Sequence, residues 1–197
     1  MLKINPIRLV GGWEAGYALD YHTLSSEYLG EDEYGHPQFE TARSEVGELL
    51  YRLKYRSEKA LVKVLSLTAS EFVKSRKWPV EIVLPVPPSR SGRGFQPVPL
   101  LAKAIAQNLG IPVSLDAVVK VKDTPELKSV YKLEERTCLL QDAYVVVVPE
   151  VSEKRVLLVD DLYRSGATLN AVAACLKAIG GVRCVYAVTC TKTRSKR

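Results

Sequence analysis

The sequence predicts an α/β protein with a central parallel sheet of about five strands flanked by helices, and a β-rich N-terminal appendage. From residue 80 onward, apolar runs without polar alternation are separated by helix-like segments, which is typical of parallel strands covered on both faces. In the first forty residues, glycines and turn residues interrupt short apolar runs. The length of 197 residues suits one domain with an appendage. We therefore expect the appendage at residues 1–40 and a core at residues 41–197.

The appendage and the segment after it show contrasting periodicities. Short β-like runs are followed by an acidic, aromatic stretch at residues 27–39, which predicts a hairpin or meander with an exposed loop near Glu31. Helices are expected next at residues 42–54 and 57–77, where apolar residues recur at helical spacing. The second helix should end before Trp78, because a residue that precedes proline avoids the helical region.

The core alternates between strands and helices. Strands are expected at residues 80–86, 113–122, 143–148, 155–160 and 182–190, and helices at residues 98–110 and 166–181. A long polar stretch at residues 123–141 separates the second of these strands from the third. A loop of that length inside a compact domain is usually functional or disordered.

The composition restricts the class of protein without fixing its function. The net charge of +6 suits ligands rich in phosphate or nucleic acid, and it equally suits a solubilising surface. None of the four cysteines stands in a C-x-x-C pair, so no zinc or redox motif is visible. The sequence shows neither a signal-peptide pattern nor an apolar run of membrane-spanning length. We therefore expect a cytoplasmic protein with no membrane partner.

The stretch "VLLVDDLYRSGATL" carries the clearest chemical signal. Asp160 and Asp161 follow a buried strand, and the small residues 165–168 form a turn into a helix. Small residues let backbone N–H groups converge on an anion, and the helix N-terminus adds the positive end of its dipole. A phosphate site beside two acids would fit a ribose 5-phosphate, whose hydroxyl groups the acids would bind. The alternative is a plain strand-to-helix turn in which an aspartate caps the helix.

At this point the sequence resembles a known family. The stretch "VLLVDDLYRSGAT" is similar to the phosphoribosyl-pyrophosphate (PRPP) signature of the class I phosphoribosyltransferases. Three other stretches resemble the ComF-like branch of that family, namely "LKYRSEKAL", "LPVPPSRSGRGFQPVPLLAKAIA" and "TPELKSVYKLEERTCLLQDAYVV". Together these stretches cover about residues 50–191 in the order that the family shows. The resemblance implies a class I phosphoribosyltransferase fold, with residues 1–40 as a possible hood.

The resemblance also implies roles for particular residues. Asp160 and Asp161 would be the catalytic acids that hold the ribose hydroxyls. The 5-phosphate would be bound by Arg164, Ser165, Gly166, Ala167 and Thr168. The pyrophosphate side would be formed by Pro87, Pro88, Ser89, Arg90, Arg93, Lys132 and Arg136, the last two in a mobile flap at residues 122–136. Mg²⁺ would be the cofactor, bound mainly through PRPP, with no direct protein ligand expected.

The sequence departs from the family in three places. One is in the flap, where the branch often shows a glutamine after Thr-Pro and this chain has Glu126 and Leu127. ComF-like chains typically begin with a cysteine-rich module, whereas this chain has no cysteine before Cys138. In hypoxanthine-type enzymes an aspartate at the position of Arg164 acts as a general base. An arginine cannot accept a proton, so we do not expect that purine mechanism here.

The function implied is the transfer of a 5-phosphoribosyl group from PRPP to an acceptor, with release of pyrophosphate. The acceptor is not readable from the sequence. An alternative is a non-catalytic phosphoribosyl-ligand sensor, or an accessory protein of DNA uptake and competence. Nucleic acid and a homodimer are left open as partners. A dinucleotide enzyme is disfavoured, because the glycine-rich fingerprint after the first core strand is missing.

Overall fold

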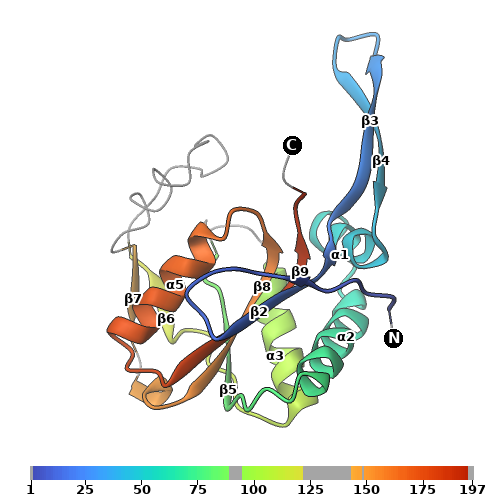
Figure 1. Cartoon of the computed structure of the whole chain (residues 1–197). Coiled ribbons are helices and arrows are strands. Elements are labelled where there is room, and N and C mark those ends of the chain that lie inside the picture. Colours follow the sequence, from blue (N-terminus) through green and yellow to red (C-terminus); the bar gives the residue numbers. More distant parts are fainter. Residues whose placement is uncertain (1, 89–94, 122–142, 148, 195–197) are drawn as a thin grey trace.

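The computed structural model describes residues 2–88, 95–121, 143–147 and 149–194. A five-stranded sheet forms the centre of the molecule (Figure 1). Its strands, in spatial order, are β1 (Ile7–Arg8), β2 (Ala15–Tyr21), β9 (Cys184–Lys192), β8 (Arg155–Tyr163) and β5 (Ile82–Pro85). Only β1 runs antiparallel to its neighbour within this sheet, and the other pairs are parallel. The predicted five-stranded, mainly parallel sheet is confirmed.

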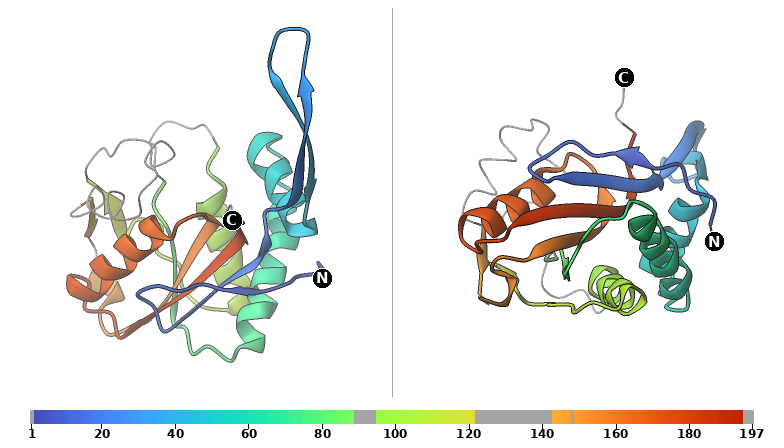
Figure 2. Two further views of the ribbon diagram at one scale, coloured as in Figure 1. Left: turned by 45° about the horizontal axis from the view of Figure 1, so that its top comes forward. Right: turned by 60° about the horizontal axis from the view of Figure 1, so that its bottom comes forward.

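Helices cover both faces of this sheet (Figure 2). One face is covered by α1 (Glu45–Tyr55), α2 (Leu61–Ser75) and α3 (Pro97–Leu109), and the other by α5 (Ala167–Ala178). Successive residues of β8 alternate between the two cores: Leu157 joins the core under α1–α3, and Leu158 joins the core under α5. Both are fully buried. An uninterrupted apolar strand is therefore required here, as the sequence pattern indicated.

The membership of the sheet differs from the expected one in two strands. Here β6 (Val118–Lys120) and β7 (Tyr144–Val146) pair with each other in a separate antiparallel sheet, before the short 3₁₀ helix Pro149–Val151. The expected strand at 113–122 does begin at the central sheet, since Val113 bridges Val83 in parallel. The chain then bends away at residues 115–117. The strand that pairs with β9 on the side away from β8 is β2, from the N-terminal segment.

Two parts of residues 1–40 behave differently. The strand β2 pairs with β9 along its length, and its Ala18 and Leu19 are fully buried on opposite faces. The next strands, β3 (Thr23–Glu31) and β4 (Pro37–Arg43), form an antiparallel hairpin that projects from the body (Figure 1), as the expected exposed hairpin. We call this hairpin the ribbon. The structure thus builds residues up to Tyr21 into the core sheet, and a hood role for residues 1–40 stays a prediction.

No helix in the described part of the chain is both long enough and apolar enough to cross a membrane.

Candidate active site at the carboxyl ends of the strands

The two predicted acids lie where β8 reaches the carboxyl edge of the sheet. The strand is fully buried from Val156 to Val159, and the residues that follow are only partly buried. Asp160 accepts a hydrogen bond from the backbone N–H of Asp161 at 2.8 Å, which fixes its carboxylate over the end of the strand. In open parallel sheets this edge is where ligands bind. The burial of four apolar residues therefore places both carboxylates at the edge.

A lysine that sequence reasoning missed pairs with the second acid. Lys54, near the end of α1, places its Nζ 2.5 Å from Oδ2 of Asp161. The side chains of Lys54 and Asp161 are 23% and 13% exposed, so the pair is largely shielded from water. The lysine stands in "LKYRSEKAL", a stretch singled out for its resemblance alone.

The first acid lies in a less polar environment. Burial raises the pKa of Asp160, and the nearby carboxylate of Asp161 raises it further. Tyr144, on β7, lies near Asp160. Burial and the charge of Asp160 raise the pKa of the Tyr144 phenol to about 12. A hydrogen bond with the Thr168 side chain opposes this shift. The hydroxyl of Thr168, expected at the phosphate, thus already contacts Tyr144.

Three basic side chains, His22, Arg43 and Lys54, gather near Asp161. His22, just after β2, lies with its Nδ1 3.2 Å from Oγ1 of Thr191. Burial lowers the pKa of His22, and the charges of Arg43 and Lys54 lower it further. His22 follows β2, Arg43 ends β4 and Lys54 lies on α1, and no sequence pattern predicts that these three segments meet. Arg43 pairs with Glu48, Lys54 pairs with Asp161, and the lowered pKa of His22 favours its neutral form.

The predicted phosphate turn has the backbone conformation that its sequence requires. Gly166 has φ of +79°, and a Cβ there would lie 2.3 Å from the hydroxyl of Tyr163. Only glycine combines this conformation with this close approach. Gly166 also precedes the first turn of α5, and no side chain caps that helix. The first N–H groups of a helix lack intrahelical acceptors, so they can donate to an anion.

An asparagine ties this turn to the N-terminal segment. Asn170 donates from its Nδ2 to the carbonyl of Gly166 at 3.0 Å, and its Oδ1 accepts from the N–H of Gly12 at 2.7 Å. Tyr163 donates to the carbonyl of Val10 at 3.2 Å. The loop at residues 10–13 therefore closes one side of the turn. Sequence reasoning missed Asn170, which looks like an ordinary helix residue.

The remaining predicted residues divide into three groups. Pro87 and Pro88 follow the end of β5, beside β8, so they lie at the same edge as the acids. Arg164 is exposed, while Ser165 and Ala167 lie in the turn itself. The other predicted pyrophosphate contacts, Ser89, Arg90, Arg93, Lys132 and Arg136, lie outside the described residues, as does the flap at 122–136.

The donor groups at this edge suit a metal that is bound through its substrate. Within the described residues no three His, Cys, Asp or Glu side chains gather as a metal site. The acids present are a pair, and one of them is engaged by Lys54. A Mg²⁺ ion that takes most of its ligands from phosphate oxygens and water needs no such cluster.

Comparisons with known proteins agree with the motifs. The family described as "Phosphoribosyl transferase domain" matches residues 96–197. Competence protein F of Haemophilus influenzae is 27% identical over 142 residues, which cover 67% of this chain and 62% of that protein.

Two solved structures are similar. One is adenine phosphoribosyl transferase from Trypanosoma brucei in complex with AMP, pyrophosphate and ribose 5-phosphate (15% identity, 94% of this chain and 73% of that chain, TM-score 0.49). The other is glutamine PRPP amidotransferase from B. subtilis (17% identity, 81% of this chain and 34% of that chain, TM-score 0.49). The family match spans half of the chain and includes the acids and the turn. This chain therefore belongs to the phosphoribosyltransferases of class I, in their ComF-like branch.

Proposed function

We propose that this protein binds PRPP and transfers its 5-phosphoribosyl group to an acceptor, with release of pyrophosphate. One observation carries the proposal. The acids on β8, just past the point where the neighbouring β5 ends, and the Gly166 turn at the start of α5 lie on one edge of the sheet, separated by only a few residues. A ribose 5-phosphate carries both kinds of group, namely hydroxyls for the acids and a phosphate for the turn.

The turn would bind the 5-phosphate. The N–H groups of the first turn of α5 supply donors, the helix dipole favours a negative charge, and Gly166 lets the ligand approach the backbone closely. Ser165 and Thr168 add hydroxyls, and Thr168 would exchange its contact with Tyr144 for one with the ligand. Arg164 is exposed and free to turn towards the phosphate.

The acids would hold the ribose. Asp160 and Asp161 would accept hydrogen bonds from the 2- and 3-hydroxyls, and Lys54 would keep the carboxylate of Asp161 in one orientation. As the bond to pyrophosphate breaks, positive charge develops on the ribose ring, and the two carboxylates stabilise it. Mg²⁺ would bind mainly through PRPP oxygens and would neutralise charge on the leaving pyrophosphate.

Pyrophosphate would be bound by the segment after β5 and by Lys132 and Arg136, because a pyrophosphate requires cationic partners that donate several hydrogen bonds. Arg136→Ala should therefore reduce PRPP affinity and leave ribose 5-phosphate binding intact, since that ligand has no pyrophosphate. Calorimetry with both ligands separates the two effects. Equal losses for both would remove Arg136 from the pyrophosphate side.

The direct test is turnover. The protein is incubated with PRPP, Mg²⁺ and a panel of nucleobases and amines, and pyrophosphate release is followed. Release that depends on one acceptor, and that disappears in the Asp160→Asn, Asp161→Asn double variant, would establish the transferase. A protein that neither binds PRPP nor releases pyrophosphate would refute the proposal.

A second function is a phosphoribosyl-ligand sensor or a DNA-uptake accessory protein. The similarity to a protein named competence protein F and the net charge of +6 favour it. PRPP binding without turnover, together with DNA binding that weakens with salt, would support this reading. In either case we propose a cytoplasmic location, because the free thiols of Cys175, Cys184 and Cys190 suit a reducing compartment.

A further inference from the structure

The ribbon is an exposed element that the reaction at the acid pair does not explain. Most residues of β3 and β4 are exposed on both faces, including Tyr28 and Phe39, each 56% exposed. Their rings contact each other across the two strands, with centroids 5.5 Å apart. A two-stranded hairpin is marginally stable in water unless another surface covers it. The described part of this chain does not supply that cover.

The aromatic face of the ribbon continues onto the body. Along β4, Phe39 and Arg43 are four residues apart and so point to the same face. The guanidinium of Arg43 lies 4.0 Å above the ring of Tyr51 on α1, and that ring lies 5.0 Å from the ring of Tyr55. Tyr55 is 63% exposed. We call the line of Tyr28, Phe39, Arg43, Tyr51 and Tyr55 the aromatic stripe.

The two ends of the aromatic stripe carry opposite charge. Residues 23–42 contain no Lys or Arg and five acids, namely Glu27, Glu31, Asp32, Glu33 and Glu40. Glu27 and Glu40 stand directly opposite each other in the ribbon, which is unfavourable unless a cation lies nearby. The other end, where α1 leads into α2, exposes Arg56, Lys59 and Lys63.

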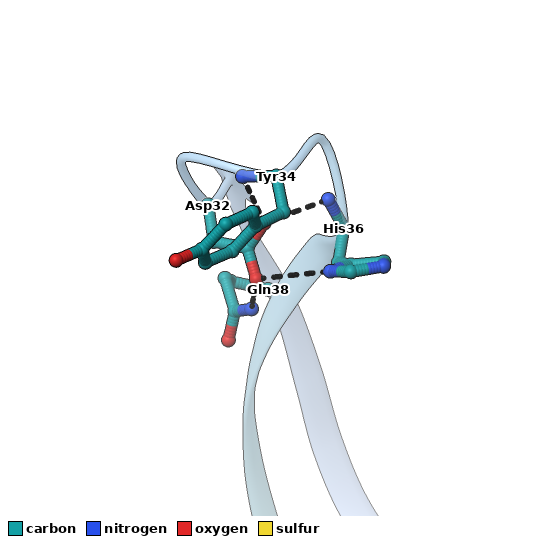
Figure 3. A network of polar contacts seen from close by, with 4 residues as sticks. All are labelled: Asp32, Tyr34, His36 and Gln38. Atoms are coloured by element: carbon teal, nitrogen blue, oxygen red, sulfur yellow. Dashed lines mark hydrogen bonds and ion pairs between the residues drawn. The ribbon is translucent and has the colours of Figure 1, made fainter.

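The ribbon is held in one shape before any partner arrives. At its tip, Asp32 accepts hydrogen bonds from the backbone N–H groups of Tyr34 and His36 and from the side chain of Gln38 (Figure 3). At its base, Ser44 donates to the carbonyl of Tyr21 and accepts from the N–H of Gly47. An ordered element loses little entropy when it binds, which favours a docking role.

We propose that the aromatic stripe is the contact between two copies of this chain, related by a two-fold axis. Such an axis sets each patch against an identical one in reverse, so the acidic ribbon of one copy meets the basic α1–α2 end of the other. The stripe is acidic at one end, basic at the other and aromatic between, and is therefore complementary to itself. All 28 Lys and Arg residues lie outside residues 23–42, so a second copy offers the charge that the ribbon requires. The proposal does not depend on the reaction at the acid pair.

The first experiment measures self-association by sedimentation equilibrium across the micromolar range at low and at high salt. The full chain should form a dimer that weakens with salt. Tyr28→Ser with Phe39→Ser should raise the dimer dissociation constant by about tenfold or more, since aromatic anchors contribute most of the affinity at interfaces. The matched control is Leu67→Ser, which removes an apolar side chain that is 42% exposed on α2, and this change should leave the constant unaltered.

The second experiment tests the orientation by exchanging charges. One variant carries Glu27→Lys, Glu31→Lys, Glu33→Lys and Glu40→Lys, and the other carries Arg56→Glu, Lys59→Glu and Lys63→Glu. Each variant alone should be monomeric, because its two contact regions have the same sign. An equimolar mixture should form a heterodimer, because each ribbon then meets the opposite charge. Thermal unfolding of each variant shows separately that it is folded.

Three outcomes would overturn the proposal: a monomer at every concentration, a dimer that tolerates the loss of both aromatic residues, or charge variants that fail to associate when mixed. A ribbon that binds only a different protein would give the first of these.

Discussion

The carboxyl edge of the sheet and the ribbon are neighbours that differ in how their polar groups are held. At the edge, the carboxylates follow four fully buried residues of β8, and the pKa of Asp160 is raised because burial disfavours its charge. In the ribbon, the side chain of Asp32 is 30% exposed, and hydrogen bonds from the His36 and Tyr34 backbone hold its pKa below the usual value. At the edge, burial makes the charged carboxylates unfavourable as long as no ligand donates hydrogen bonds to them. At the ribbon tip, hydrogen bonds stabilise the charge of Asp32. Along the ribbon, large apolar side chains remain exposed to water.

The largest expected effect is at the acid pair. Asp160→Asn with Asp161→Asn should leave the protein folded and lower PRPP affinity by about 100-fold or more, because two charge-assisted contacts to the ribose disappear. Calorimetry with PRPP and Mg²⁺ measures the loss. Glu153→Gln, an exposed acid that precedes β8 and so lies at the opposite end of that strand, is the matched control. Unchanged affinity in the double variant would end the assignment of the ribose site.

The next effect is at the phosphate turn. Gly166→Ala should weaken ribose 5-phosphate binding by about tenfold or more, because the added methyl collides with Tyr163 and distorts the donors. Gly110→Ala is a close control: its φ of +70° imposes a similar backbone strain, but no atom lies within 4 Å of the new methyl. Gly166→Ala should lose at least as much stability as Gly110→Ala, because it adds the contact with Tyr163 to a similar backbone strain. If both also bind the ligand as the parent does, the turn is only a helix start.

The ion pair should have a smaller effect, seen in stability. Lys54→Met should lower the free energy of unfolding by about 1–2 kcal/mol, because it leaves the largely buried Asp161 without its partner. Lys74→Met removes a lysine from an exposed pair with Glu71 and should cost less than about 0.5 kcal/mol. Urea unfolding measures both. Equal costs would mean that the edge is no more shielded than the surface.

The raised pKa of Asp160 predicts a pH dependence. In the folded state this carboxyl keeps its proton to higher pH than in the unfolded state, so its contribution to stability falls as pH rises from about 4 through the raised pKa. Asp160→Asn should remove that fall and stabilise the protein by about 1 kcal/mol or more near neutral pH. Thermal unfolding from pH 5 to 9 tests it. Parallel curves for variant and parent would contradict the prediction.

The smallest effect is expected at the ribbon tip. Asp32→Ala should speed amide hydrogen exchange at Tyr34 and His36, whose N–H groups lose their acceptor, and should leave the melting temperature within about 1 °C. Glu33→Ala, at the same tip, is the control. A large change in melting temperature would show that the ribbon, like the carboxyl edge, contributes to the stability of the core.

The sequence predicts a region well when the residues that form it are close together in the chain. Asp160, Asp161 and Gly166 are close in the chain, and a buried strand before a small-residue turn places them without further information. Lys54, His22 and Asn170 reach the site from distant elements, and no local pattern marks a residue that acts through tertiary contact.

The strands show the same limit. The sequence pattern assigns β2 to an appendage because glycines interrupt this segment, although Ala18 and Leu19 within it are fully buried. Conversely, residues 118–120 and 144–146 look like core strands but pair with each other, since pairing partners are chosen by the whole fold. The pair Glu27 and Glu40 became informative only once the register of the ribbon was known.

The hydrogen bond between Gly12 and Asn170 joins positions 158 residues apart, and β2 lies between β1 and β9. On the ribosome, β2 therefore emerges long before the strand that will cover its free edge has been made. Until then its backbone donors and acceptors are open to other chains, so this protein should depend on chaperones during synthesis more than its size suggests. The phosphate turn, completed by the same contact, would be among the last parts of the molecule to form.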